Sequence, residues 1–281
     1  MEDIKGLRRR GELRSPKEIA EEFCKIGAAK SQLKTVKTFI LAVLAGAYIG
    51  FGGNIAITIT QDLSEYMGVG FTQFMGGAVF SVGLMLVVIG GAELFTGNNL
   101  LIISCLSRKV KLKDLIMNWV TVYLGNFFGS VLLAALIFLS NLYTMGGFAL
   151  GIKALTMANA KVNLDVVSAV SRGILCNWLV CMAVWLTMAS DDVISKIFSC
   201  FFPIMAFVAS GFEHCVANMF FMPYGLLLKD VPYLVALSGL NLSNLTWSNF
   251  IFVNLLPVTI GNIIGGAFFV GTLYCYLYVF E

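Results

Sequence analysis

The sequence predicts an all-α integral membrane protein with six spans in two inverted three-span halves. Three observations support this prediction: 58% of the 281 residues are apolar and 12% are charged, the mean hydropathy is +0.86, and a short motif occurs twice. Soluble domains carry about 25% charged residues, so a chain of this composition needs lipid as its solvent. The net charge of +3 gives no indication of a nucleic-acid partner.

The spans are marked by stretches without charged residues. Two short apolar pieces, 94–107 and 214–228, directly follow Glu93 and Glu213. Each is shorter than the ~20 residues that a crossing needs, so we join each to the apolar run before it and expect the second and fifth spans to be broken. The last stretch begins as an Asn- and Ser-rich loop and continues as the sixth span from about Phe250. The uncharged stretches are 38–61, 66–92, 115–152, 173–190, 197–212 and 231–280.

The distribution of Lys and Arg predicts the orientation. Basic residues crowd the segment between Lys5 and Lys37 and the loop 108–113, which lie on the same side of a six-span protein. That side is cytoplasmic by the positive-inside rule. We therefore expect both termini in the cytoplasm and a multi-pass protein of the inner (plasma) membrane. The opposite side carries few basic residues: Lys153, Lys161, Arg172 and Lys229.

We divide the chain into an N-terminal segment, 1–36, and a transmembrane domain, 37–281. The first repeat of that domain covers about 37–140 and the second about 165–281. Both repeats contain the motif Gly-x-Glu-x-x-x-small-Asn, at 91–98 and 211–218, and later share a second set of residues. This second set pairs Asn118, Gly125, Asn126 and Gly129 with Asn254, Gly261, Asn262 and Gly265.

Three spans in each half make the repeat inverted, and its broken helices are typical of a transport pathway. Non-helical backbone at membrane depth is tolerated only where it lines a cavity or is buried in protein. Broken helices also direct half-helix N-termini toward the midplane, which favours anions. The alternative is that both helices are kinked for packing alone. The glycines of the spans indicate close helix packing.

The N-terminal segment contains a predicted amphipathic helix over 15–30. Ser15 and Glu18 can form a capping box around Pro16, which suits a first turn. Ile19, Phe23 and Ile26 fall on one face of this helix. It lies either on the cytoplasmic rim or as a lid over the mouth of a pore.

His214 is the single histidine of the chain and lies at the second break. Ionisable groups inside a bilayer are costly and tend to face a pathway, so a pore role is expected, with a purely structural role as the alternative. A histidine there could give or take a proton near neutral pH. Thr96 lies at the first break, opposite His214 in the repeat, and is the expected hydrogen-bond partner.

Glu93 and Glu213 each precede a half-helix, where a carboxylate can accept from free N–H groups. Ionised carboxylates lining the pathway would repel anions, so this structural role is favoured. We expect no disulfide, metal or cofactor, because the cysteines lie mostly in apolar runs and have no metal-type spacing. No nucleophile elbow or phosphate-binding loop indicates an enzyme.

Four runs of the sequence resemble the formate/nitrite transporter family, and the likeness extends over about residues 35–280. The resemblance implies homopentamers with an aquaporin-like fold and one pore per subunit. It also implies that the first break is the Ω-loop of that family and the second its S-loop. The runs are 91–98, 173–181, 211–219 and 257–265.

The resemblance assigns functions to individual residues. Thr96 and His214 are expected to form the central polar pair of the pore. Glu93, Asn98, Glu213 and Asn218 are expected to support it, and Asn177 and Lys161 to attract or orient the anion in the outer half. The expected constrictions are Leu84, Leu94 and Phe95 on the cytoplasmic side and Phe80 and Phe207 on the outer side.

Within the family, the chain looks closest to the hydrosulfide channels of anaerobic clostridia. We therefore expect a lipid-embedded passive channel for small monovalent anions, with hydrosulfide as the substrate and nitrite or formate as alternatives. One rival is a neutral-solute, aquaporin-like channel, although neither Asn98 nor Asn218 begins the Asn-Pro-Ala signature of that class. The other rival, a membrane enzyme, lacks a catalytic cluster.

Overall fold

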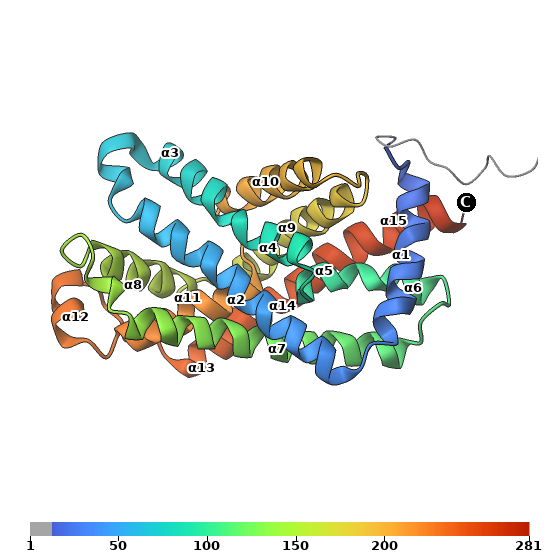
Figure 1. The fold of residues 1–281 in the computed structure, drawn as a ribbon. Helices are drawn as coiled ribbons and strands as arrows, with labels where there is room; N and C mark the ends of the chain where they lie inside the picture. The colour runs from blue at the N-terminus through green and yellow to red at the C-terminus, as the bar shows by residue number, and fades with distance from the viewer. Residues whose placement is uncertain (1–12, 281) are drawn as a thin grey trace, which may run out of the picture.

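The computed structural model describes residues 13–280, and in this range the chain is helical without strands, as predicted. The first twelve residues, with several basic side chains used above for orientation, lie outside the described part. Figure 1 shows α1, the loop after α6 and the C-terminal end at one end of the molecule, and α8 and α12 at the other.

The first half holds three spans and a short preceding helix. The second span is α3 with α4, and after a break at residues 91–94 the chain continues as α5, η1 and α6. The helices are α1 (Pro16–Ser31), α2 (Thr35–Thr60), α3 (Leu63–Phe80), α4 (Val82–Gly90), α5 (Phe95–Asn98), η1 (Asn99–Leu101), α6 (Ile102–Leu106) and α7 (Leu112–Leu139).

The second half repeats this plan, including its short preceding helix. The fifth span is α10, which is followed by a break at residues 211–214 and then α11. The last span is one helix over Trp247–Phe280 with several wide π-helical turns. Its labelled parts include α13 (Trp247–Asn249), α14 (Leu256–Ile263) and α15 (Leu273–Cys275). The other helices are η2 (Leu142–Thr144), α8 (Ala149–Val162), α9 (Val166–Thr187), α10 (Val193–Ala209), α11 (Cys215–Leu228) and α12 (Pro232–Ser238).

Within residues 13–280, five helices are long and apolar enough to cross a membrane. A sixth is counted if α11 and α12, which are bent by 105°, are taken as one span. By this count α10, the first part of the broken fifth span, is a shorter apolar helix of 17 residues. The third uncharged stretch, predicted over 115–152, is not one element: α7 ends at Leu139 and α8 begins at Ala149. No charged residue marks this boundary, which is made by a turn with Gly146 and Gly147 at positive φ.

The two breaks begin in the same way. Gly91 ends α4 and Gly211 follows α10, with φ angles of 76° and 72°. Left-handed backbone of this kind is accessible to glycine without a steric cost. The first glycine of each repeated motif is thus explained by the need to stop a helix inside the membrane domain.

The spans of each half pack closely because glycines face neighbouring backbone. A Cβ atom on Gly129 would collide with the carbonyl oxygen of Val43 in α2, and one on Gly265 with that of Ile174 in α9. Small residues permit this approach of helix backbones. The glycine positions shared by the third and sixth spans therefore serve close packing, as predicted.

Helix α1 has the predicted capping box between Ser15 and Glu18. Its buried face, with Ile19 and Phe23, packs against α6, α9 and the end of the last helix. Arg14 fastens its start to the loop after α9: its backbone N–H donates to the Ala189 carbonyl at 3.0 Å, and its guanidinium pairs with Asp191. This helix is packed onto the transmembrane domain.

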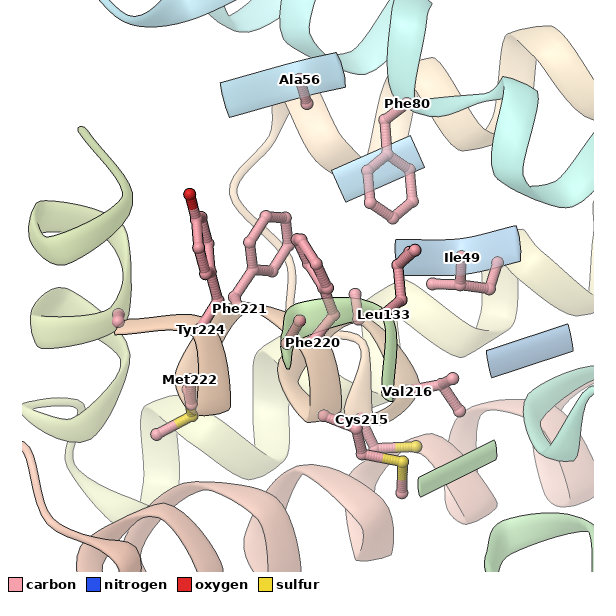
Figure 2. Packing of buried hydrophobic residues seen from close by; sticks show 14 of the residues in the cluster. Ile49, Ala56, Phe80, Leu133, Cys215, Val216, Phe220, Phe221, Met222 and Tyr224 are labelled. Carbon is pink, nitrogen blue, oxygen red and sulfur yellow. The ribbon is translucent and has the colours of Figure 1, made fainter. Parts of the chain in front are cut away.

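The core around the second break is aromatic. Phe220, Phe221 and Tyr224 of α11 lie side by side (Figure 2), with Phe220 stacked on Tyr224 at a centroid distance of 5.8 Å. Phe80 of α3 packs near these rings, with its ring centroid 6.4 Å from that of Phe221. The half-helix α11 is therefore held by large apolar contacts along its length, and its first residues are fixed in space.

Candidate functional site

Thr96 and His214 meet where the two breaks face each other. The Oγ1 of Thr96 lies 2.8 Å from the Nε2 of His214, and the two residues are 0% and 3% exposed. We call these residues the central pair. Thr96 belongs to the first turn of α5, while His214 is the residue immediately before α11. The internal repeat thus brings one residue from each half to the same point.

The other nitrogen of His214 has a fixed partner. Nδ1 accepts the backbone N–H of Ala217 at 3.1 Å and so caps the N-terminus of α11. A neutral imidazole has one donor and one acceptor nitrogen. Since Nδ1 accepts, Nε2 carries the proton and donates to the hydroxyl of Thr96.

A cavity of about 380 Å³ reaches His214 from the α8 end of the molecule. We call it the α8-side cavity. Phe80 and Phe207 line it, with ring centroids 5.8 Å apart, and Phe207 lies 5.9 Å from the His214 ring. Lys161 and the exposed Arg172 give its walls positive charge.

A second cavity, of about 260 Å³, opens from the α1 end. We call it the α1-side cavity. Leu84 and Leu94 line its inner part and are 1% and 3% exposed. Phe23, Ile26 and Lys30 of α1 form another part of its wall. The central pair therefore adjoins both cavities: His214 lines the α8-side cavity, and Leu94 and Gly97, which flank Thr96 in the sequence, line the α1-side cavity.

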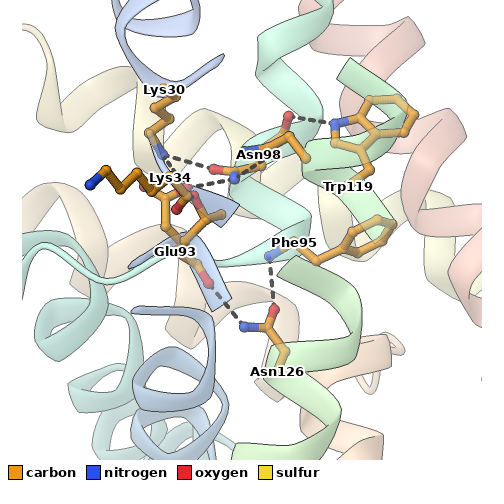
Figure 3. Close-up of polar contacts among 9 residues, drawn as sticks. Lys30, Lys34, Glu93, Phe95, Asn98, Trp119 and Asn126 are labelled. Carbon is orange, nitrogen blue, oxygen red and sulfur yellow. Dashed lines mark hydrogen bonds and ion pairs between the residues drawn. The ribbon is translucent and has the colours of Figure 1, made fainter. Parts of the chain in front are cut away.

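Lys30, Glu93 and Asn98 form a hydrogen-bonded group that we call the first triad (Figure 3). The Lys30 ammonium lies 2.9 Å from both the Glu93 carboxylate and the Asn98 Oδ1. Asn98 Nδ2 donates to Glu93 at 2.7 Å and to Asn118 of α7 at 2.9 Å. The carboxylate is thus neutralised beside the cavity.

Lys161, Glu213 and Asn218 form the second triad. Lys161 donates to Glu213 at 2.8 Å, and Asn218 Nδ2 donates to the same carboxylate at 2.7 Å and to Asn254 at 2.7 Å. Lys30 is the second-last residue of α1, as Lys161 is of α8. The repeated unit thus includes the helix before each set of spans.

Asn126 and Asn262 each hold one break in place by hydrogen bonds, and we call each of these residues with its contacts an asparagine clamp. Asn126 accepts the Phe95 N–H at 2.9 Å and donates to the Ala42 and Glu93 carbonyls. Asn262 accepts the Cys215 N–H, also at 2.9 Å, and donates to the carbonyls at Gly173 and Glu213. Both were visible as repeated positions in the sequence, but the repeat alone does not say what they bind.

The expected capping by the glutamates is wrong. In the described chain, Glu93 and Glu213 accept from lysine and asparagine side chains. The half-helix N–H groups are bound by Asn126, Asn262 and His214 instead. A carboxylate that binds a lysine ammonium gains the attraction between two opposite charges in addition to the hydrogen bond, which explains the exchange of partners.

Asn177 does not lie in the outer half of the pathway, contrary to the expectation from the family resemblance. It is fully buried, and its Nδ2 donates to the Asn262 carbonyl at 2.7 Å and to Asn99 at 2.8 Å, with the Thr96 carbonyl at 3.3 Å. Asn177 therefore supports the turn that carries Thr96. The other residue expected there, Lys161, does line the α8-side cavity.

Phe95 does not join Leu84 and Leu94 at the α1-side cavity. Its ring points toward α7 and packs against Trp119 and Tyr123, with centroid distances of 6.3 and 4.9 Å (Figure 3). Neighbouring residues at the start of α5 point in different directions, so Leu94 and Phe95 cannot both face one cavity. The expectation that Phe95 forms a constriction is not supported by this packing.

Comparison with known proteins gives the same architecture. The sequence profile of the family described as "Formate/nitrite transporter" matches residues 17–276. The "Probable formate transporter" of Methanothermobacter thermautotrophicus is 41% identical over 95% of this chain and 98% of its own. The "Formate channel FocA" of Escherichia coli K12 is 39% identical over 94% and 93%.

Two solved structures share the fold. The "Pentameric formate channel with formate bound" superposes with a TM-score of 0.79 at 37% identity, covering 87% of this chain and 98% of that one. The "FNT family ion channel" gives a TM-score of 0.78 at 28% identity, covering 92% and 98%.

The fold and the central pair that adjoins two cavities define an integral membrane transport protein. The chain belongs to the formate/nitrite transporter family. The predicted fold, with its broken second and fifth spans, and the prediction that the chain is no enzyme are both confirmed by this membership. The likeness to the hydrosulfide subgroup is not among these findings.

Proposed function

We propose that the chain is a passive channel for small monovalent anions that passes them by way of the central pair. The observation that carries this proposal is the 2.8 Å contact between Thr96 and His214, which places two hydrogen-bonding groups adjacent to both cavities. A small anion could replace either contact partner and be bound by the other. At the α8-side cavity, Lys161 and Arg172 exceed the single carboxylate of Glu213 and leave net positive charge, whereas Lys30 and Glu93 balance each other at the α1-side cavity.

Apolar constrictions would select against large and strongly hydrated ions. We assign this function to Leu84 and Leu94 on the α1 side and to Phe80 and Phe207 on the α8 side. Each of these residues is at most 3% exposed, so a solute must lose most of its water to pass. Size and dehydration are the usual basis of selectivity in such pores, and an uncharged or hydrogen-bonded species crosses more easily.

The geometry of His214 favours a neutral donor over a proton carrier. An imidazolium has N–H groups on both nitrogens, and the one at Nδ1 would face the N–H of Ala217 and lose the cap of α11. We therefore propose that His214 stays neutral and donates from Nε2 to the passing anion. This replaces the proton exchange considered from the sequence.

We propose formate as the principal substrate. Two relatives with about 40% identity carry formate in their names, as does a structural neighbour. Hydrosulfide and nitrite remain rivals of the same chemical class, because each is a small monovalent base with a neutral acid form. Purified protein in liposomes should pass formate faster than hydrosulfide, nitrite or chloride; faster hydrosulfide flux in the same vesicles would reverse the assignment.

We also propose a homopentamer in the inner (plasma) membrane with both termini in the cytoplasm. A structural neighbour is described as pentameric, and large apolar side chains such as Phe128, Phe252 and Tyr276 are exposed for contact with lipid or other subunits. The α1 end is then the cytoplasmic one. Native mass spectrometry in mild detergent should show five subunits, and a stable trimer would contradict the proposal.

A neutral-solute channel is the remaining rival function. The exposed Arg172 at the α8-side cavity argues against it, because a pathway for neutral solutes needs no excess of positive charge at its mouth. Liposome swelling in glycerol tests this directly. Swelling at the rate of formate-driven swelling would favour the neutral-solute channel.

A further inference from the structure

The two triads differ by one hydrogen bond. In the first, the Lys30 ammonium binds both Glu93 and Asn98 Oδ1. In the second, the Lys161 ammonium binds Glu213, and the Oδ1 of Asn218 is buried without a hydrogen-bond partner in the described chain. The internal repeat thus shows which contact the second triad lacks.

The orientation of the Asn218 amide is fixed by its neighbours. Its Nδ2 faces two oxygens, one of Glu213 and the Oδ1 of Asn254, each at 2.7 Å. Asn254 in turn uses its own Nδ2 to donate to the Lys161 carbonyl at 3.0 Å. The free atom of Asn218 is therefore an acceptor. A buried carbonyl oxygen without a donor is unfavourable, so a donor should reach it in some state of the protein.

The internal repeat points to Lys161 as that donor, because Lys30 binds the equivalent oxygen of Asn98. Its side chain is 14% exposed, lines the α8-side cavity and places Nζ 5.5 Å from the centre of the Phe221 ring. An ammonium has three N–H donors, and the described residues supply one hydrogen-bond acceptor for them. Lys161 is thus held by Glu213 and the aromatic face, with donor capacity left at the cavity.

We propose that Lys161 alternates between two positions and that Asn218 is the positioning residue for this movement. In the present position the ammonium stays on Glu213 and offers an N–H to an anion in the α8-side cavity. In the second position it bridges Glu213 and Asn218, as Lys30 bridges Glu93 and Asn98, and the anion is released. This inference rests on the proposed anion channel and adds a step at one mouth.

The competition between Asn218 and the anion has a measurable consequence. In proteoliposomes with known protein orientation, formate flux is measured at rising formate concentration on either side. Asn218→Ser shortens the side chain, which draws its oxygen back toward the backbone and out of reach of the ammonium. The half-saturation concentration on the α8 side should then fall about fivefold, the order expected for one net hydrogen bond. Phe221→Leu removes the aromatic face that holds the present position, so the same concentration should rise.

Two controls separate this from a structural effect. Asn98→Ser is the matched change in the first triad. It should change the half-saturation concentration for formate on the α1 side alone. In a Lys161→Gln background, Asn218→Ser should have no further effect. Additive effects of these two changes, or equal shifts on both sides for Asn218→Ser, would overturn the inference.

The outcome remains decisive if Asn218→Ser fails to assemble, because Phe221→Leu tests the same movement from the other position. A folded Phe221→Leu protein with unchanged or lower half-saturation on the α8 side refutes the two positions. Failure of the proposed function would look different: the wild-type protein would then show no saturable formate flux from either side.

Discussion

Asn126 and Asn262 make the same three kinds of contact in opposite halves of the chain. Each accepts the first N–H of a half-helix and donates to two carbonyls, one of which belongs to the glutamate of the break. Both residues are 0% exposed. A single side chain thus joins a half-helix, a break and a neighbouring span in each half of the chain.

Replacing either asparagine by alanine should lower the free energy of unfolding by about 2–4 kcal/mol, because buried backbone groups lose their partners. Thermal unfolding of the purified oligomer measures this loss. Asn126→Ala and Asn262→Ala should have similar effects, while Asn241→Ala, in an exposed loop, should have little. A strong effect at only one of the two buried positions would show that the halves are not equally held.

His214→Asn separates the two functions of the imidazole. Asparagine is a good N-cap residue and can accept the Ala217 N–H, but it lacks a donor at the position of Nε2. Formate flux should fall roughly tenfold or more, as expected for a lost hydrogen bond to a charged group, while the unfolding temperature is kept. His214→Phe should lose both flux and stability. Wild-type flux in a folded His214→Asn protein would remove His214 from the pathway.

The pH profile of His214→Asn tests whether the imidazole carries a proton. A neutral donor predicts that the residual flux keeps the shape of the wild-type profile, because only the substrate titrates. A proton carrier predicts a flatter profile. Flux of formate measured between about pH 5 and 8, the range in which histidine ordinarily titrates, decides between these outcomes.

Thr96→Ala should weaken formate flux less than His214→Asn does. Thr96 accepts from His214 through its hydroxyl, and a water molecule can take that place at a small cost. We expect a loss of about threefold for alanine, while Thr96→Ser retains the hydroxyl and most of the flux. A greater loss for Thr96→Ala than for His214→Asn would assign the main anion contact to the hydroxyl.

Leu94→Ala and Phe95→Ala should have different effects although the residues are adjacent. Leu94 lines the α1-side cavity, so its truncation should raise conductance and relax size selectivity. Phe95 packs against Trp119 and Tyr123, so its truncation should cost about 3–5 kcal/mol of stability through the cavity left behind. Single-channel or vesicle flux and thermal unfolding are measured together. A higher flux in Phe95→Ala alone would place that ring in the pathway.

The sequence alone was sufficient to predict the two halves and their breaks, because a glycine and a glutamate mark each break. It did not reveal α8, since no charge separates that helix from the apolar run of α7, and the equivalence of Lys161 with Lys30 therefore stayed hidden. It also could not orient Phe95. A family resemblance places a residue at a position along the chain, but the direction of its side chain depends on the turn of α5 and on the rings packed against it.

The glutamates show a second limit. Their position before a half-helix is the sequence pattern of a cap, and the cap is present at both breaks. The cap is made by Asn126 and Asn262, which lie far along the chain from the N–H groups that they bind. The carboxylates bind Lys30 and Lys161 instead, and the distance in sequence gives no indication of these contacts. Residue type and position therefore predict that the free N–H groups of each half-helix are capped, but the tertiary fold determines which side chain caps them.

The inverted arrangement also bears on rectification. Each break, triad and asparagine clamp has a counterpart that faces the opposite way, so a solute meets nearly the same sequence of groups from either compartment. Equal driving forces of opposite sign should then give nearly equal currents. Any preference for one direction must come from the positions where the halves are not alike, and at the centre these are a hydroxyl on one side and an imidazole on the other.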